Sequence, residues 1–229
     1  MRARLNSMFF TQSAFDSASP VGSAVVAHRF DDEGDYDVHL GRAKEPPERV
    51  VLTVGPAAAD RSSGAVGVTI DTAPARSDAA ADRRGRLTAG GYASFSTPSA
   101  RGVDSVIVAR RQGAEVDEFD SRRLGPGDVY GLTLVRPGVY SVRNTLGDAT
   151  GRIVVDYPVV GSRPYRPAEP VRVSCARNGL APSEIRVGPG QGIVFDIETD
   201  ARLIIDLVEP DDGPNPRPRG RRARHRRAE

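Results

Sequence analysis

The sequence has no tryptophan, and among its 229 residues it has one cysteine, two methionines and a single lysine, Lys44. Aromatic residues make up 6% of the chain, so a core must be built mainly from Val, Ile, Leu and Ala. The lone cysteine excludes an internal disulfide framework. No stretch approaches the roughly 18 apolar residues that a membrane-spanning helix needs, and the first residues lack the apolar run of a secretory signal. We therefore expect a soluble, cytoplasmic protein without membrane contact.

Charge is distributed unevenly along the chain, although the formal net charge is only +2. From Pro214 onward the sequence reads PNPRPRGRRARHRRAE, with seven arginines and one glutamate. Without this segment, 25 basic and 29 acidic residues remain, so the rest of the chain carries a formal charge of −4. This division predicts a mildly acidic folded part with a disordered basic tail at 214–229.

Glycine and proline are abundant, with 24 and 18 residues, and they separate many short apolar runs. Apolar and polar residues alternate within these runs: Val171, Val173 and Cys175 share one face of a strand, and Ile193 and Phe195 share one face of another. A period of two residues with one polar face is typical of antiparallel sheets packed as a sandwich. The sequence therefore predicts an all-β protein.

The apolar runs fall into zones that are separated by polar or proline-rich segments. A short helix is plausible only within 73–87, APARSDAAADRRGRL. The predicted zones are a strand zone at 1–56, a larger one at 65–158, a third at 171–208, and the tail at 214–229.

Parts of these zones resemble one another. RLTAGGYASF aligns without a gap with RVGPGQGIVF, which brings Phe95 onto Phe195. FDDEGDY aligns in the same way with LVRPGVY, which brings Tyr36 onto Tyr140. The middle zone thus holds a front half followed by a back half, whereas the first zone holds only a back half and the third only a front half. This pattern indicates an internal repeat.

The halves resemble the cupredoxins, the blue-copper proteins. The front half APSEIRVGPGQGIVFDIETD is similar to their opening strands, and the back half LGPGDVYGLTLVRPGVYSVRN…GRIVV is similar to their closing strands. The resemblance implies a Greek-key sandwich, complete at 65–158. An isolated half would expose an apolar face and open edges. A second sandwich is therefore expected from 1–56 and 171–208, within one chain or between two chains.

The residues that would hold copper in this family are missing. Such a site uses one His after the front half and Cys, His and Met in the loop of the back half. Here Leu203 falls at the position of the front-half His, Asn144 at that of the Cys, and Thr150 near that of the Met. In the first zone the Cys position falls on Leu40. We therefore expect a cupredoxin-like fold without metal or other cofactor.

Two histidines and the cysteine are the remaining candidates for a metal site. His28 and His39 lie on the two strands of one predicted hairpin, and no third ligand accompanies them, so whether they bind a metal stays open. Cys175 lies on the apolar face of its strand, which predicts a core thiol. With three histidines in the whole chain and no Ser-His-Asp pattern, we expect no enzyme.

Two further motifs receive structural interpretations. GPGQG at 188–192 is similar to a phosphate-binding loop, but it precedes a strand, so a β-turn is expected. Asp117, Glu118 and Asp120 form an acidic cluster, which is expected to be a solvated loop.

The sequence favours a non-catalytic binding or structural module that acts through surface contacts with a protein partner or a second copy. Strand edges and the connector SRPYRPAEP, with Tyr165 as an exposed anchor, are candidate contacts. The alternatives are a copper-binding electron-transfer protein and a nucleic-acid-associated protein. The latter would use non-specific polyanion contact, for which the tail supplies Arg217, Arg219, Arg221, Arg222, Arg224, Arg226 and Arg227.

Overall fold

The computed structural model describes residues 8–43, 45–57, 67–74, 83–97, 102–111, 117–157 and 165–213. Within these ranges the regular structure consists of strands β1 to β17 and one short helix, α1 (Met8–Thr11). The predicted all-β class is therefore confirmed. No helix of the described residues is long and apolar enough to cross a membrane.

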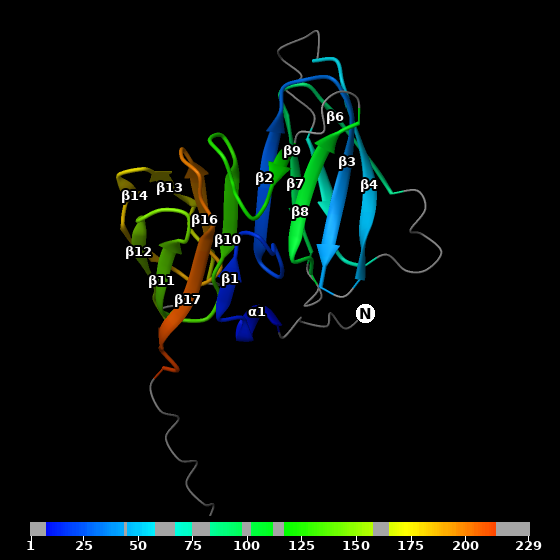
Figure 1. Cartoon of the computed structure of the whole chain (residues 1–229). Coiled ribbons are helices and arrows are strands. Elements are labelled where there is room, and N and C mark those ends of the chain that lie inside the picture. Colours follow the sequence, from blue (N-terminus) through cyan, green and yellow to red (C-terminus); the bar gives the residue numbers. More distant parts are fainter. Residues whose placement is uncertain are drawn as a thin grey trace, which may run out of the picture.

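The largest of three sheets has seven strands and connects the two halves of the molecule (Figure 1). We call it the central sheet. In spatial order its strands are β14 (Gly179–Ala181), β13 (Val171–Ala176), β16 (Gly192–Ile197), β10 (Val129–Thr133), β2 (Ala24–Phe30), β7 (Gly91–Ser96) and β5 (Val68–Asp71).

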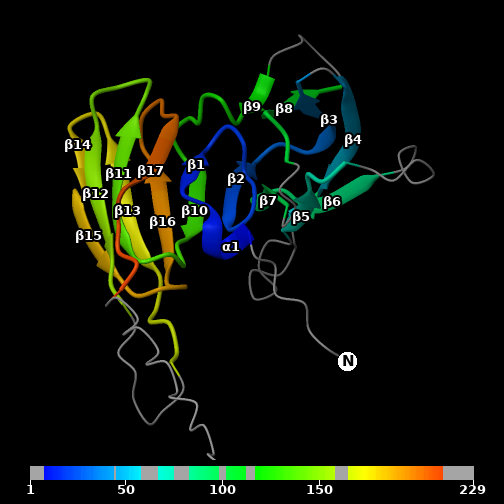
Figure 2. The same ribbon diagram turned by 90° about the horizontal axis from the view of Figure 1, so that it is seen from below.

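Two five-stranded sheets lie side by side against the central sheet (Figure 2). The first outer sheet has the order β6 (Arg84–Thr88), β4 (Glu45–Gly55), β3 (Gly34–Arg42), β8 (Ser105–Arg110) and β9 (Asp117–Asp120). The second outer sheet has the order β15 (Glu184–Val187), β12 (Thr150–Val155), β11 (Gly138–Asn144), β17 (Leu203–Pro210) and β1 (Ala14–Asp16). The first outer sheet with β2, β7 and β5 forms the first sandwich, and the second outer sheet with β10, β16, β13 and β14 forms the second.

One face of the central sheet carries a continuous apolar row. Alternate residues of a strand point to the same face, and directly paired residues of neighbouring strands lie side by side. In register across six strands, the row consists of Val173, Phe195, Tyr130, Val26, Phe95 and Ile70. All six are buried, so a single hydrophobic core extends through both sandwiches.

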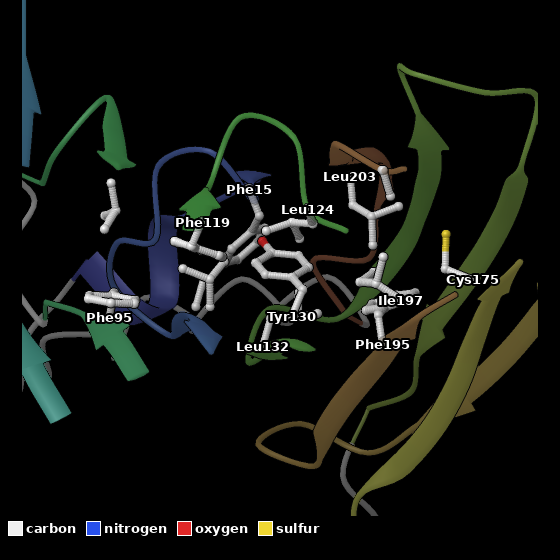
Figure 3. Close-up of a cluster of buried hydrophobic side chains, with 14 of the residues drawn as sticks. Phe15, Phe95, Phe119, Leu124, Tyr130, Leu132, Cys175, Phe195, Ile197 and Leu203 are labelled. Atoms are coloured by element: carbon white, nitrogen blue, oxygen red, sulfur yellow. The ribbon is translucent and has the colours of Figure 1, made fainter. Parts of the chain in front are cut away.

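The two sandwiches meet where β2 and β10 pair in antiparallel fashion. Aromatic side chains fill the space between the two outer sheets at this junction (Figure 3). Phe119 of β9 stacks on Phe95 with ring centres 5.5 Å apart, and Tyr130 stacks on Phe195 at 6.1 Å. Phe15 of β1 lies close to the Tyr130 ring in the same cluster. The sandwiches are thus joined by hydrogen-bonded strands and by shared core packing.

The two short strands at the junction carry the same tripeptide, Phe-Asp-Ser, and make equivalent contacts. The Ser17 amide donates to the Leu203 carbonyl at 3.0 Å, and the Ser17 hydroxyl accepts from the Leu203 amide at 3.1 Å. Ser121 makes the same two bonds with Val106, at 2.9 and 2.8 Å. The strand that precedes β2 therefore completes the second outer sheet, and the strand that precedes β10 completes the first.

The halves combine differently from the expectation based on the sequence. The back half in the first zone pairs with 68–120, and the back half in the middle zone pairs with 171–210. The strands of 65–158 are thus divided between two sandwiches, in contrast to the complete sandwich expected there. Among the described residues, the first zone pairs with the third only through β1. The sequence pattern of alternating halves is the same whichever neighbours combine. The pairings of β3 with β8 and of β11 with β17 show that each back half combines with the front half that follows it in the chain.

The helix that was plausible within 73–87 is not seen where the structure describes this segment. Arg84–Thr88 forms strand β6, which pairs in parallel with β4 and buries Leu87. Residues 75–82 lie outside the described residues. Buried and exposed positions alternate in β6. The packing of this buried face decides for a strand, although the composition of the segment favours a helix.

Candidate functional site

Two adjoining hollows open at the junction of the sandwiches, near the end of β2. Their volumes are about 420 and 380 Å³, and both are lined by His28, Glu118 and Pro126. We call them together the junction hollow. The remaining lining residues are Arg29, Asp31, Asp32, Tyr92, Phe119, Asp120, Arg123, Gly125, Gly127 and Asp128.

His28 reaches the hollow because β2 alternates and this residue shares the inner face with Val26 and Phe30. Its ring packs edge-on against Phe30, with centres 4.8 Å apart, and against Phe119 at 5.2 Å. The imidazole Nδ1 lies 2.6 Å from the Asp128 carboxylate, a short hydrogen bond. His28 is therefore held on one side by rings and on the other by a carboxylate.

Asp128 directly precedes β10 and is almost fully buried. The Gly125 amide donates to Oδ2 of this carboxylate at 2.7 Å, while Oδ1 faces the His28 ring. The Asp128 amide in turn donates to the Gly125 carbonyl at 3.1 Å, so the turn before β10 fixes the carboxylate in place. Because an ionised carboxylate only accepts hydrogen bonds, Nδ1 of His28 carries the proton in this contact.

In the neutral ring with its proton on Nδ1, the second ring nitrogen of His28, Nε2, is an acceptor. Nε2 is buried and has no hydrogen-bond partner among the described residues, and the nearest carboxylate oxygen, Oε1 of Glu118, lies 3.9 Å away. Glu118 stands on β9 at the edge of the first outer sheet, with its side chain 34% exposed. Nε2 and the Glu118 carboxylate therefore present two acceptors that a single donor-rich group could satisfy.

The charge of the hollow is predominantly negative. Most of its carboxylates already have basic partners: Asp31 pairs with Arg29 at 2.9 Å, and Asp120 pairs with Arg122 at 2.7 Å. Among the described residues, no arginine or lysine pairs with Glu118. The pKa of the nearby Tyr36 is raised by burial and, to a smaller extent, by the negative charge of Glu118. The hollow is thus suited to a cationic group.

The other sandwich provides an internal comparison for the His28–Asp128 pair. The same separation of 104 residues relates Phe15 to Phe119 and Tyr36 to Tyr140. Both tyrosines donate to the carbonyl four residues earlier, at 3.0 and 2.9 Å. By this separation the positions of Asp128 and His28 correspond to Ala24 and Leu132, which are buried and directly paired. Two apolar residues therefore fill this position in the other sandwich, so the fold does not require the His28–Asp128 pair.

We expect the substitution Asp128→Ala to lower the free energy of unfolding by about 2 kcal/mol, because it leaves the Gly125 amide and His28 Nδ1 without their acceptor. The double substitution His28→Leu/Asp128→Ala, which copies the equivalent pair, should recover at least half of this loss. Urea unfolding of the three proteins measures both values. A double variant no more stable than Asp128→Ala would contradict the equivalence of the two positions.

The positions expected for copper ligands meet in space but hold other residues. Asn144 and Leu203 are direct partners in the pairing of β11 with β17, and both are buried. The Asn144 side chain accepts from the Leu146 and Arg202 amides at 3.0 and 2.9 Å, which leaves its carbonyl oxygen occupied. In the first sandwich the equivalent neighbours are Leu40 and Val106.

The remaining candidates from the sequence are not assembled into one metal site. His39 lies on β3 in the first outer sheet, where it pairs with Arg49 and Ile107, whereas His28 lies on the inner face of the central sheet. Cys175 is buried in the core, and burial raises the pKa of its thiol. Among the described residues, no group of three or more His, Cys, Asp or Glu side chains is arranged to hold a metal ion.

Two interpretations of local motifs have different outcomes. The predicted β-turn at GPGQG is confirmed: the Gln191 amide donates to the Gly188 carbonyl at 3.1 Å, and Gly190 has a φ of +80°. The acidic cluster is not a loop. It lies on strand β9, with Phe119 buried in the core and Glu118 facing the hollow. The seven arginines from Arg217 to Arg227 lie outside the described residues.

Sequence reasoning missed Asp128 and interpreted His28 as an ordinary strand histidine or a metal ligand, not as one partner of a hydrogen-bonded pair. One signal was present: Phe-Asp-Ser occurs twice, and each copy is followed within about ten residues by a strand. In an alignment of the two copies, His28 falls on Leu132 and Asp128 falls on Ala24, so two polar residues align with two apolar ones.

No family model, curated protein or solved structure matches this chain.

Proposed function

We propose that the protein is a non-enzymatic binding module that receives a cationic side chain of a protein partner in the junction hollow. The observation that carries this proposal is the hydrogen-bonded His28–Asp128 pair, whose Nε2 has no hydrogen-bond partner among the described residues and lies 3.9 Å from the Glu118 carboxylate. A guanidinium group has five donors in a planar fork and can engage a carboxylate and a further acceptor together.

Binding requires a small movement of one side chain. Glu118 covers Nε2 in the closed arrangement, and its long side chain on an edge strand can rotate to another rotamer at low cost. The guanidinium then donates to Glu118 and to His28 Nε2. Asp31 and Asp32, which pair with Arg29 and Arg110, lie at the rim. The Tyr92 ring at the rim, 42% exposed, offers its face to the same cation.

We further propose that each sandwich is a Greek-key, cupredoxin-like unit and that the chain arose by duplication of one unit. The equal strand order of the outer sheets and the equivalent serine contacts support this history. On this view the metal position is closed in both units, by Asn144 with Leu203 and by Leu40 with Val106. The rival function, copper electron transfer, predicts a stoichiometric copper content and an intense blue absorption, which metal analysis of the purified protein would detect.

The binding proposal is tested by titrating the protein with a hexa-arginine peptide in a calorimeter. We expect Glu118→Gln to weaken binding about tenfold, because the charge-assisted pair is lost. The matched control is Glu184→Gln, which removes an exposed carboxylate from the edge strand β15 of the other sandwich and should leave the affinity unchanged. Equal affinities for all three proteins, or no binding at all, would contradict the proposal.

A further inference from the structure

We infer that the occupant of the junction hollow is the C-terminal segment 214–229 of a second copy of this chain. The inference rests on the proposed function, since it names the partner that supplies the cation. Its first support is charge complementarity: the segment has seven arginines against one glutamate, and the rest of the chain carries a formal charge of −4.

The second support is the position of the hollow relative to the end of the described chain. The hollow adjoins the start of β17, where Leu124 exchanges backbone hydrogen bonds with Ala201, and Arg123 pairs with Asp200. The chain then runs along β17 to Pro210 at the opposite end of the second sandwich (Figure 1). Segment 214–229 therefore begins at the end of the molecule that lies away from the hollow.

The reach of the segment favours a second copy over the same copy. The eight residues of β17 span about 26 Å, and the hollow lies farther still, across the junction at β9. A fully extended chain spans at most about 3.6 Å per residue, so Arg222 lies no more than about 32 Å from Gly213. By the same measure Arg217 and Arg219 cannot reach the hollow of their own chain, and Arg221 and Arg222 reach it only along a nearly straight path, which the folded body obstructs. Within one chain only the last three arginines have length to spare. An adjacent copy placed end to end presents its hollow to the whole segment.

Such a contact joins two different surfaces, the hollow of one copy and the segment of the next. A contact of this kind leaves a free hollow at one end and a free segment at the other, so it extends into chains of copies unless the rotation closes a ring. Because it depends on charge, the association should weaken as salt shortens the Debye length to about 8 Å at physiological ionic strength.

The test is sedimentation velocity of the full chain over a range of concentrations, at low and at physiological ionic strength. We expect the average sedimentation coefficient to rise with concentration at low salt and to fall when salt is added. Glu118→Gln should require about tenfold more protein for the same association, whereas Glu184→Gln should behave as the unchanged protein. A synthetic peptide of residues 214–229 should dissociate the copies, and the same peptide with glutamine at its seven arginine positions should not.

The outcomes separate this inference from the proposed function. If hexa-arginine binds the hollow but the full chain stays monomeric and peptide 214–229 does not bind, the inference is wrong and the proposed function stands. If neither peptide binds, both fail. Association that Glu118→Gln leaves unchanged would also overturn the inference. So would a segment that binds a short oligonucleotide while the copies remain apart, a result that would favour nucleic-acid contact.

Discussion

Replacing Tyr130 with alanine should lower the free energy of unfolding by about 3–5 kcal/mol, the loss typical of deleting a large buried aromatic side chain. The ring occupies the centre of the apolar row in the central sheet, between Val26 and Phe195, and it is fully buried. Figure 3 shows it within the cluster that also includes Phe15 and Leu124. Because this cluster lies where both sandwiches meet, the cavity would loosen both at once.

The conservative substitution Tyr130→Phe should not lower the free energy of unfolding. The Tyr130 hydroxyl is buried and has no hydrogen-bond partner among the described residues. Burial, together with the charge of Asp16, raises the pKa of Tyr130, so the hydroxyl keeps its proton and stays an unsatisfied donor. Removing it should leave stability unchanged or raise it by up to about 1 kcal/mol. Chemical unfolding of both variants checks the pair of values, and a loss above about 2 kcal/mol for Tyr130→Phe would show that the hydroxyl has a partner.

The second large effect is expected at Gly138, where β11 begins. Its φ is +140°, and a Cβ added there would lie 2.5 Å from the Glu209 carbonyl oxygen and 3.1 Å from the Asp211 amide nitrogen. Both neighbours are backbone atoms of the paired strand and of the residue that follows it, so they cannot move aside as a side chain can. We expect Gly138→Ala to cost more than about 3 kcal/mol through strain and steric overlap together.

Gly34 supplies the matched control, because it begins β3 at the equivalent position of the first sandwich. Its φ is +149°, but the nearest atoms to an added Cβ belong to the flexible Arg110 guanidinium, at 3.5 Å and beyond. Gly34→Ala should therefore show the conformational strain alone, about 1–3 kcal/mol. Thermal unfolding of the two variants compares them, and equal losses would mean that overlap with the Glu209 carbonyl contributes nothing.

The strands were predictable because their alternation is a local property of the sequence. The buried faces of β13 and β16, with Val173 and Cys175 on one and Ile193 and Phe195 on the other, lie as the alternation predicts. The division into sandwiches was not predictable in the same way. Pairing of β2 with β10 depends on residues about 100 positions apart, and no local pattern states which back half meets which front half.

The candidate site shows the same limit. His28 is visible in the sequence as a histidine on a strand, but its partner Asp128 lies 100 residues away and at the end of a turn. Only the antiparallel register of two strands brings them together, and that register follows from packing across the whole central sheet. The internal alignment could have supplied a clue, since the equivalent positions are Ala24 and Leu132. A polar pair where the related half is apolar is the kind of departure that marks a functional site.

The most direct test of the account is nitrogen-resolved NMR of the histidine rings during titration with hexa-arginine. The chain has three histidines, so His28 can be assigned by substitution, and His39 on the outer sheet is an internal reference. We predict that His28 carries its proton on Nδ1 and that its Nε2 resonance shifts as the peptide binds, while His39 does not respond. A His28 resonance that stays unchanged while the peptide binds would contradict the assignment of the junction hollow as the binding site.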